Sequence, residues 1–112
     1  MRRQADTPWF QSILLFDPAT AIRRVKQPML LVHGVLDQQV PVSHAERLAE
    51  LARKESRSKS VELVIVKGVN HLMAPATTGE VAEYATLTDR NVSTDVSAAV
   101  AGWLTKTLQA IK

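Results

Sequence analysis

Two residue types that can carry acid–base chemistry follow the two most apolar segments of the chain. Asp37 comes three residues after the run Met29–Gly34, and His71 comes five residues after the run Val61–Val66. A carboxylate bonded to an imidazole fixes the tautomer of the ring and stabilises the imidazolium formed when the ring takes a proton from a nucleophile. Asp37 and His71 are therefore candidates for two members of a catalytic triad.

Each of these residues also has a simpler interpretation. Aspartate is a favoured turn residue, so Asp37 is compatible with a role in bracing the turn before Val40 and Pro41. His71 is compatible with an ordinary hydrogen-bonded histidine in a loop. For each residue considered alone, the structural role is the favoured interpretation.

The strands that would position the pair are indicated by continuous apolar runs. Residues 29–33 lie between Pro28 and Gly34, and residues 61–66 are closed by Gly68; both runs contain few charges, which is typical of strands buried on both faces of a parallel sheet. Residues 72–92 contain Pro75, Gly79 and many threonines, which predicts an ordered loop.

Helices are expected at about residues 18–25, 43–54 and 94–111. Asp17 followed by Pro18 predicts the start of the first helix. Ser43 followed by Glu46 predicts a capping box for the second. Residues 7–16 show no clear period.

This order predicts an α/β fold built around a strand–helix–strand unit with parallel strands, in three layers. The carboxyl ends of parallel strands meet at one edge of a sheet, where ligands and chemistry are usually placed. We therefore expect a hydrogen bond between Asp37 and His71, although 34 residues separate them.

Length and composition bound the class of protein. With 112 residues, the chain is long enough for a single domain, placed at residues 1–112. Hydrophobic residues make up 46% and charged residues 22%, which is ordinary globular usage and excludes a disordered chain. Because cysteine is absent, disulfide scaffolds, zinc ribbons, iron–sulfur sites and cysteine nucleophiles are excluded, and a cytoplasmic location is expected.

Several partners and cofactors are not expected. The basic segment RKESRSK at residues 53–59 contains no aromatic residue, which argues against nucleic acid. The apolar run at residues 13–16 is too short to enter a membrane. Glycine spacing excludes dinucleotide and P-loop motifs, and a metal site of His33, Asp37 and His71 lacks further ligands, so no cofactor or metal is expected.

The sequence around the candidate pair resembles that of the α/β-hydrolase family, in particular its serine esterases, acyl hydrolases and dipeptidyl-peptidase-like enzymes. PMLLVHGVLDQQVP is similar to the strand and loop that carry the triad acid, and VELVIVKGVNHLM to those that carry the triad histidine. TPWFQSILLFDPATAIRRVKQP and TGEVAEYATLTDRNVSTDVSAAVAGWL are similar to the flanking segments. The resemblance covers about Thr7 to Leu104 and implies that Asp37 is the orienting acid and His71 the general base.

The sequence departs from this family at the nucleophile. An α/β-hydrolase carries its serine in Gly-x-Ser-x-Gly on an earlier strand, with the oxyanion hole formed beside it and by an earlier loop. The four glycines stand at positions 34, 68, 79 and 102, so this motif is absent. Because the family order is Ser, Asp, His, we expect a partial domain, the C-terminal part of a hydrolase acting on ester, thioester or peptide substrates.

A sheet of two apolar strands would have unpaired edges. We therefore expect a homo-oligomer, or a complex with an N-terminal partner chain that carries the serine. The alternative function is a non-catalytic assembly module that self-associates through exposed sheet edges. A third hypothesis is a stand-alone esterase with an unconventional nucleophile.

Overall fold

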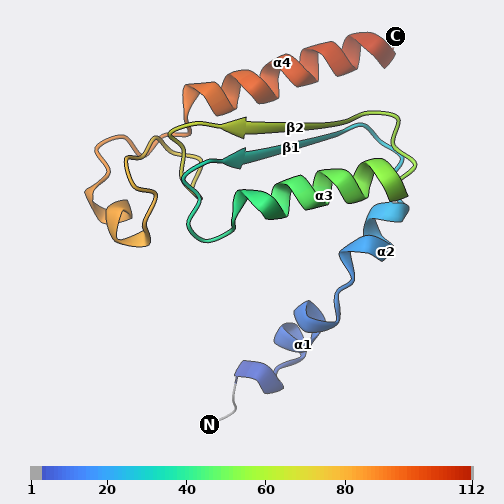
Figure 1. Ribbon diagram of the computed structural model, residues 1–112, viewed down its shortest axis with the longest axis horizontal. Coiled ribbons are helices and arrows are strands. Elements are labelled where there is room, and N and C mark those ends of the chain that lie inside the picture. Colours follow the sequence, from blue (N-terminus) through green and yellow to red (C-terminus); the bar gives the residue numbers. More distant parts are fainter. Residues whose placement is uncertain (1–3, 112) are drawn as a thin grey trace.

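The computed structural model describes residues 4–111, so the domain expected at residues 1–112 extends slightly beyond the described range (Figure 1). The elements are the 3₁₀ helix η1 (Gln4–Asp6), α1 (Pro8–Leu15), α2 (Pro18–Arg23), β1 (Met29–Gly34), α3 (Val42–Glu55), β2 (Val61–Val66), the 3₁₀ helix η2 (Val81–Thr86) and α4 (Thr94–Ile111).

A two-stranded parallel sheet forms the centre of the fold. β1 and β2 pair in register from Met29 with Val61 to Gly34 with Val66, and α3 connects them. α3 lies against one side of the sheet and α4 against the other (Figure 1). The predicted α/β class, the two strands and their parallel pairing are confirmed.

α1 was not anticipated from the sequence. Residues 7–16 have no clear apolar period, yet Pro8–Leu15 is helical. The signal lies at its start, because the Thr7 side chain accepts a hydrogen bond from the Phe10 N–H and Pro8 occupies the first turn. A cap and a proline thus define a helix that periodicity alone does not reveal.

α2 starts as predicted but is shorter than the predicted range 18–25. The Asp17 carboxylate caps it by accepting a hydrogen bond from the Ala19 N–H at 3.0 Å. The helix ends at Arg23, and Pro28, which cannot donate a backbone hydrogen bond, follows before β1.

α3 matches its predicted range within one residue at each end, but the predicted capping box is wrong. The helix begins at Val42, after Pro41, which makes no side-chain capping bond. Ser43 is therefore already inside the first turn, where its hydroxyl cannot cap the helix. Proline fixes an extended backbone angle at position 41, and this supplies the entry to the helix instead.

A small apolar cluster lies near the carboxyl ends of the strands. Its buried members are Val66, Val69 and Val96, with Val32, Val64 and Met73 packed against them. α3 adds buried alanines to the core, at positions 45, 49 and 52. The prediction that both strands are buried on both faces is wrong, because most of their residues are only half-buried. Within residues 4–111 each strand has one neighbour, so its other edge is uncovered.

The predicted loop at residues 72–92 is ordered but contains the short helix η2. The Glu83 carboxylate, on η2, accepts hydrogen bonds from the backbone N–H groups of Thr77, Thr78 and Gly79 at 3.0–3.3 Å. Hydrogen bonds from Thr78 and Gly79 hold the pKa of Glu83 below its usual value. One side chain therefore closes the loop onto itself.

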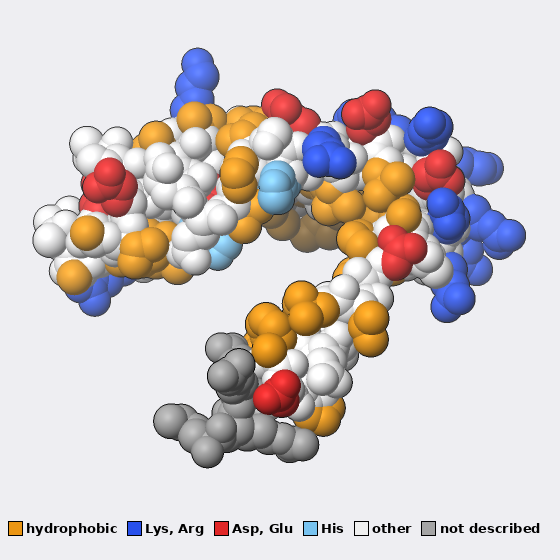
Figure 2. All heavy atoms as spheres, turned by 60° about the horizontal axis from the view of Figure 1, so that its bottom comes forward, with side chains coloured by type: hydrophobic (Ala, Val, Ile, Leu, Met, Phe, Trp, Pro, Cys, Tyr) orange, Lys and Arg blue, Asp and Glu red, His pale blue; other side chains and the backbone are white. Residues whose placement is uncertain are grey.

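α1 projects from the rest of the molecule and exposes most of its apolar side chains. Leu15 is 85% exposed, and Trp9, Leu14 and Phe16 are exposed as well. Figure 2 shows hydrophobic side chains on the surface of this projecting segment. Among the elements of the described residues 4–111, α1 contacts η1 alone. No helix within residues 4–111 has both the length and the apolar character needed to cross a membrane.

Candidate active site

The two loops that carry Asp37 and His71 leave the sheet in direct contact. Leu36 N–H donates to the Val69 carbonyl at 2.9 Å, which continues the strand pairing beyond the sheet. Gly34 permits this approach, because a Cβ atom at this position would lie 2.3 Å from the same Val69 carbonyl oxygen. A residue without a side chain is therefore required where β1 ends.

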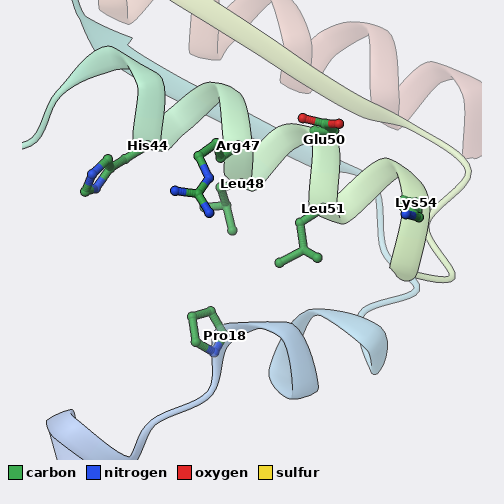
Figure 3. A pocket seen from close by; sticks show the side chains of 7 residues that line it. All are labelled: Pro18, His44, Arg47, Leu48, Glu50, Leu51 and Lys54. Atoms are coloured by element: carbon green, nitrogen blue, oxygen red, sulfur yellow. The ribbon is translucent and has the colours of Figure 1, made fainter.

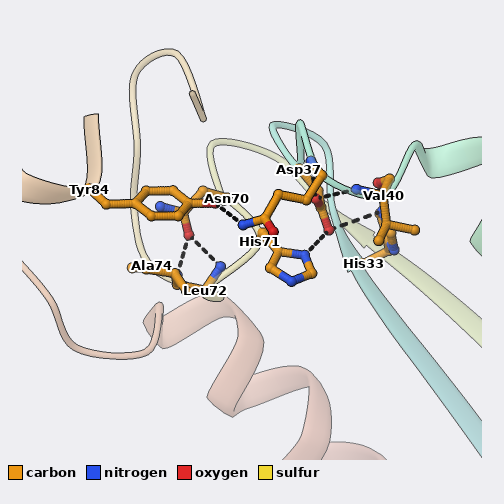
Figure 4. A network of polar contacts seen from close by, with 9 residues as sticks. His33, Asp37, Val40, Asn70, His71, Leu72, Ala74 and Tyr84 are labelled. Atoms are coloured by element: carbon orange, nitrogen blue, oxygen red, sulfur yellow. Dashed lines mark hydrogen bonds and ion pairs between the residues drawn. The ribbon is translucent and has the colours of Figure 1, made fainter. Parts of the chain in front are cut away.

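The Asp37 carboxylate is buried and engaged on both oxygens. Its Oδ1 accepts from the backbone N–H groups of Gln39 at 2.9 Å and Val40 at 2.8 Å. Its Oδ2 lies 2.9 Å from Nδ1 of His71 (Figure 4). Burial by itself raises the pKa of Asp37, but the hydrogen bonds from Val40, His71 and Gln39 outweigh it and lower the pKa. Asp37 is therefore ionised at neutral pH.

Asn70 shapes the turn that presents His71. Its side chain is fully buried, and Oδ1 accepts from the N–H groups of Leu72 at 2.9 Å and Ala74 at 3.1 Å. Within this turn Met73 adopts a left-handed backbone with φ of 62°. Sequence analysis included Asn70 only as part of the segment VELVIVKGVNHLM, and its hydrogen bonds give it a structural role.

The other ring nitrogen of His71 is unoccupied. The His71 side chain is 38% exposed, and Nε2 makes no hydrogen bond to any residue between 4 and 111. Because Asp37 can only accept, Nδ1 carries the proton in the neutral ring and Nε2 carries the lone pair. The predicted hydrogen bond between Asp37 and His71 is thus present, and it leaves a basic nitrogen facing away from the carboxylate (Figure 4).

Two further residues near the pair were not assigned to it from the sequence. His33 is buried, and its Nε2 lies 2.8 Å from the Val40 carbonyl and 3.6 Å from Oδ2 of Asp37. Tyr84, on η2, accepts a hydrogen bond from the Gln39 side chain at 2.8 Å. The spacing of four residues between His33 and Asp37 could have indicated that the two lie close together. No sequence signal could have placed Tyr84 near Gln39, because 45 residues separate them.

Another groove and other histidine and serine side chains lie away from this site. A groove of about 450 Å³ between α2 and α3 is lined by Pro18, His44, Arg47, Leu48, Glu50, Leu51 and Lys54 (Figure 3). His44 lies on the first turn of α3. Ser12 on α1 donates its hydroxyl hydrogen to the Trp9 carbonyl. Across residues 4–111 no group of three or more His, Asp or Glu side chains is arranged to hold a metal ion.

Comparison with known proteins gives one match. Residues 4–109 match the sequence model of the prolyl oligopeptidase family, which covers nearly the whole chain. No curated protein and no solved structure matches it. The match confirms the resemblance to α/β-hydrolases of the dipeptidyl-peptidase-like kind and supports a hydrolase-like origin. With the paired Asp37 and His71 at the predicted sheet edge, this chain belongs to the prolyl oligopeptidase family.

Proposed function

We propose that this chain supplies the acid and the histidine of a serine hydrolase that acts on ester, thioester or peptide bonds. The observation that carries the proposal is the 2.9 Å contact between Oδ2 of Asp37 and Nδ1 of His71, with Nε2 left free of bonds to residues 4–111. Asp37 is the orienting acid and His71 the general base. In this proposal the three-layer unit is the C-terminal part of an α/β-hydrolase domain in the cytoplasm.

The proposed chemistry follows from the protonation of the pair. A serine hydroxyl placed at Nε2 of His71 gives its proton to the ring as its oxygen attacks the carbonyl carbon of the substrate. The imidazolium that forms is stabilised by the ionised Asp37, whose lowered pKa keeps it charged. The same ring then returns the proton to the leaving group.

The nucleophile is proposed to come from polypeptide other than these residues. None of the four glycines forms a Gly-x-Ser-x-Gly motif, so neither a serine elbow nor its oxyanion hole can be assigned in this sequence. An N-terminal segment of a longer protein and a separate partner chain would both satisfy the requirement. No cofactor takes part in this chemistry.

Hydrolysis of an activated ester tests the free basic nitrogen of His71 by itself. Without a serine, this nitrogen attacks p-nitrophenyl acetate, p-nitrophenolate leaves, and water hydrolyses the acetylimidazole that forms, so the chain should hydrolyse this ester faster than its His71→Ala variant does. His44→Ala is the matched control, because it removes a histidine that lies away from Asp37. Equal rates for His71→Ala and His44→Ala would contradict the proposal.

Labelling with a fluorophosphonate, followed by mass spectrometry, tests where the nucleophile lies. We expect no adduct on the chain alone, because no serine occupies an elbow motif. An adduct that disappears in His71→Ala would instead identify a nucleophile within the chain and support the stand-alone esterase hypothesis.

Exposed apolar surface favours a second candidate function, a non-catalytic assembly module. The outer edges of β1 and β2 are unpaired within residues 4–111, and α1 exposes Trp9, Leu14 and Leu15 without a partner element in the body. Burial of such surface against a second copy would be favourable. In this proposal the chain forms a homo-oligomer, and the Asp37–His71 pair is a structural remnant.

Sedimentation velocity over a range of concentrations tests this second candidate. The wild-type chain should sediment as a dimer or larger species, and Leu14→Ser combined with Leu15→Ser should shift it toward monomer. Val81→Ser is the control, since Val81 is an exposed apolar residue of η2 outside α1. A wild-type chain that remains monomeric at every concentration would overturn the assembly proposal.

A further inference from the structure

A continuous series of hydrogen bonds runs from His33 to His71. Nε2 of His33 lies 2.8 Å from the Val40 carbonyl, and the Val40 N–H donates to Oδ1 of Asp37 at 2.8 Å. Oδ2 of Asp37 accepts a hydrogen bond from Nδ1 of His71 at 2.9 Å. All four residues appear together in Figure 4. Both backbone polar groups of Val40 are therefore fixed, one by the carboxylate and the other by His33.

The chemistry of the acceptor assigns the proton on His33. A carbonyl oxygen can only accept a hydrogen bond, so Nε2 of His33 carries a hydrogen and points it at Val40. The same nitrogen lies 3.6 Å from Oδ2 of Asp37, beyond ordinary hydrogen-bond distance. His33 therefore satisfies Val40 and leaves Oδ2 to His71.

We propose that His33 is a positioning residue that holds the Asp37 carboxylate in the orientation that accepts the Nδ1–H of His71. It acts through the backbone of Val40, which joins the Asp37 turn to the start of α3. This inference deepens the proposed function and takes its catalytic meaning from it. Its physical content, the order of the Asp37–His71 hydrogen bond, is measurable without a nucleophile or a substrate.

The geometry of the turn explains why one buried side chain has this effect. The first half of the turn is anchored by backbone bonds of Leu36 to Val69 and of Asp37 to Gly34. The second half is held by the Asp37 carboxylate, by His33 and by the bond of the Gln39 side chain to Tyr84. Of these, only the Asp37 carboxylate and His33 hold the backbone of Val40 within residues 4–111, so without His33 this backbone would depend on the carboxylate whose direction it helps to determine. Water would then bind the Val40 carbonyl in place of His33, and the turn would become looser.

The test uses the proton NMR resonance of the His71 Nδ1–H in the full chain, identified by its absence in His71→Ala. In His33→Leu and His33→Asn, which cannot place a donor at the Nε2 position, this proton should exchange with water about tenfold faster, as when one ordinary hydrogen bond is lost. His33→Gln places its amide N–H near that position and should restore slow exchange.

Tyr84→Phe is the matched control, because it removes a different hydrogen bond to the same turn, the one from the Gln39 side chain. We expect this variant to leave the His71 signal unchanged. In the same NMR spectra, contacts between protons of the paired strand residues Met29 and Val61 show whether the sheet remains folded in each variant.

Three results would overturn the proposal. The first is an unchanged His71 signal in folded His33→Leu or His33→Asn, and the second is a His33→Gln variant that behaves like His33→Asn. The third is loss of the sheet in both His33→Leu and His33→Asn, which would assign His33 to overall stability. Failure of the ester-hydrolysis test would overturn the proposed function and leave this resonance untouched, so the two failures are distinguishable.

Discussion

At the scale of single residues, Asp37 connects the two loops of the candidate site. It is 8% exposed and accepts three hydrogen bonds, two from the backbone of its own turn and one from His71. These bonds stabilise the ionised form of Asp37 in the folded chain only, so its folded pKa is lower than its unfolded value. Ionised Asp37 therefore adds to stability at neutral pH.

Replacement of Asp37 by asparagine should remove this contribution. The wild-type free energy of unfolding should include the Asp37 contribution above the unfolded pKa of about 3.9, and that contribution should be lost as the pH falls through the lower folded pKa. Asp37→Asn should cost about 1.5–3 kcal/mol at pH 7, the usual value for a lost hydrogen bond to a charged group. Urea unfolding of both chains between pH 7 and acid measures the difference. An equally steep acid loss in the variant would contradict the assignment to Asp37.

The second residue-scale prediction concerns Gly34. A Cβ atom would lie 2.3 Å from the Val69 carbonyl, so Gly34→Ala must push the two site loops apart. We expect a loss of about 1–3 kcal/mol, typical of overpacking, in the free energy of unfolding. Gly102→Ala on α4 is the control with the opposite sign. A Cβ there meets no atom within 4 Å, and alanine in a helix is favoured by about 0.5–1 kcal/mol.

At the scale of elements, capping residues and loop hydrogen bonds define structure that apolar periodicity does not predict. Thr7 with Pro8 starts α1, and Asp17 with Pro18 starts α2, so the same short signal acts twice. The loop after β2 is organised by Glu83, whose carboxylate collects three backbone N–H groups. η2 in turn carries Tyr84 to the Asp37 turn.

Glu83→Ala should therefore loosen the loop without disturbing the sheet. Amide hydrogen exchange at Thr77, Thr78 and Gly79 should accelerate, while the strands remain protected. In the wild type, acidification through the lowered pKa of Glu83 should reduce the protection of these amides relative to their intrinsic exchange rates, because the protonated carboxyl accepts these bonds less well. Glu80→Ala, which removes the neighbouring carboxylate, should change none of these rates, and equal effects of the two variants would contradict the role given to Glu83.

At the scale of the whole molecule, apolar residues are distributed unevenly between the body and its ends. The core near the carboxyl ends of the strands is small, whereas α1 projects and the last turns of α4 expose Leu108 and Ile111. On α4 only Val96, near its start, is buried. The surface that lacks an internal partner is therefore concentrated in two helices at opposite ends of the chain.

Self-association through α1 predicts a fluorescence change. In a Trp103→Phe variant the remaining tryptophan, Trp9, reports on α1 alone, and it is 65% exposed in the single chain. Acrylamide should quench Trp9 efficiently in dilute solution and less efficiently as concentration rises. Quenching that does not depend on concentration would show that Trp9 is outside any interface.

Sequence patterns alone were enough to predict both strands, the two long helices and the candidate pair, although they missed α1 and η2. Apolar runs and proline and glycine boundaries predicted β1, α3, β2 and α4 closely, because these signals are local. The Asp37–His71 pair was also accessible, since parallel strands bring their carboxyl ends to one edge of the sheet. The sequence around Asp37 and His71 resembles that of α/β-hydrolases, and the family match over residues 4–109 confirms this resemblance.

Packing in three dimensions sets which side chains surround that pair and how much of the chain is covered. The contact of His33 with the Val40 carbonyl and that of Tyr84 with Gln39 depend on how the turn and η2 lie in space, which residue types do not encode. The incomplete burial of both strands follows from the number of elements packed on the sheet rather than from the strands themselves. Apolar patterning reports that a surface should be buried, but packing against a partner determines whether it is.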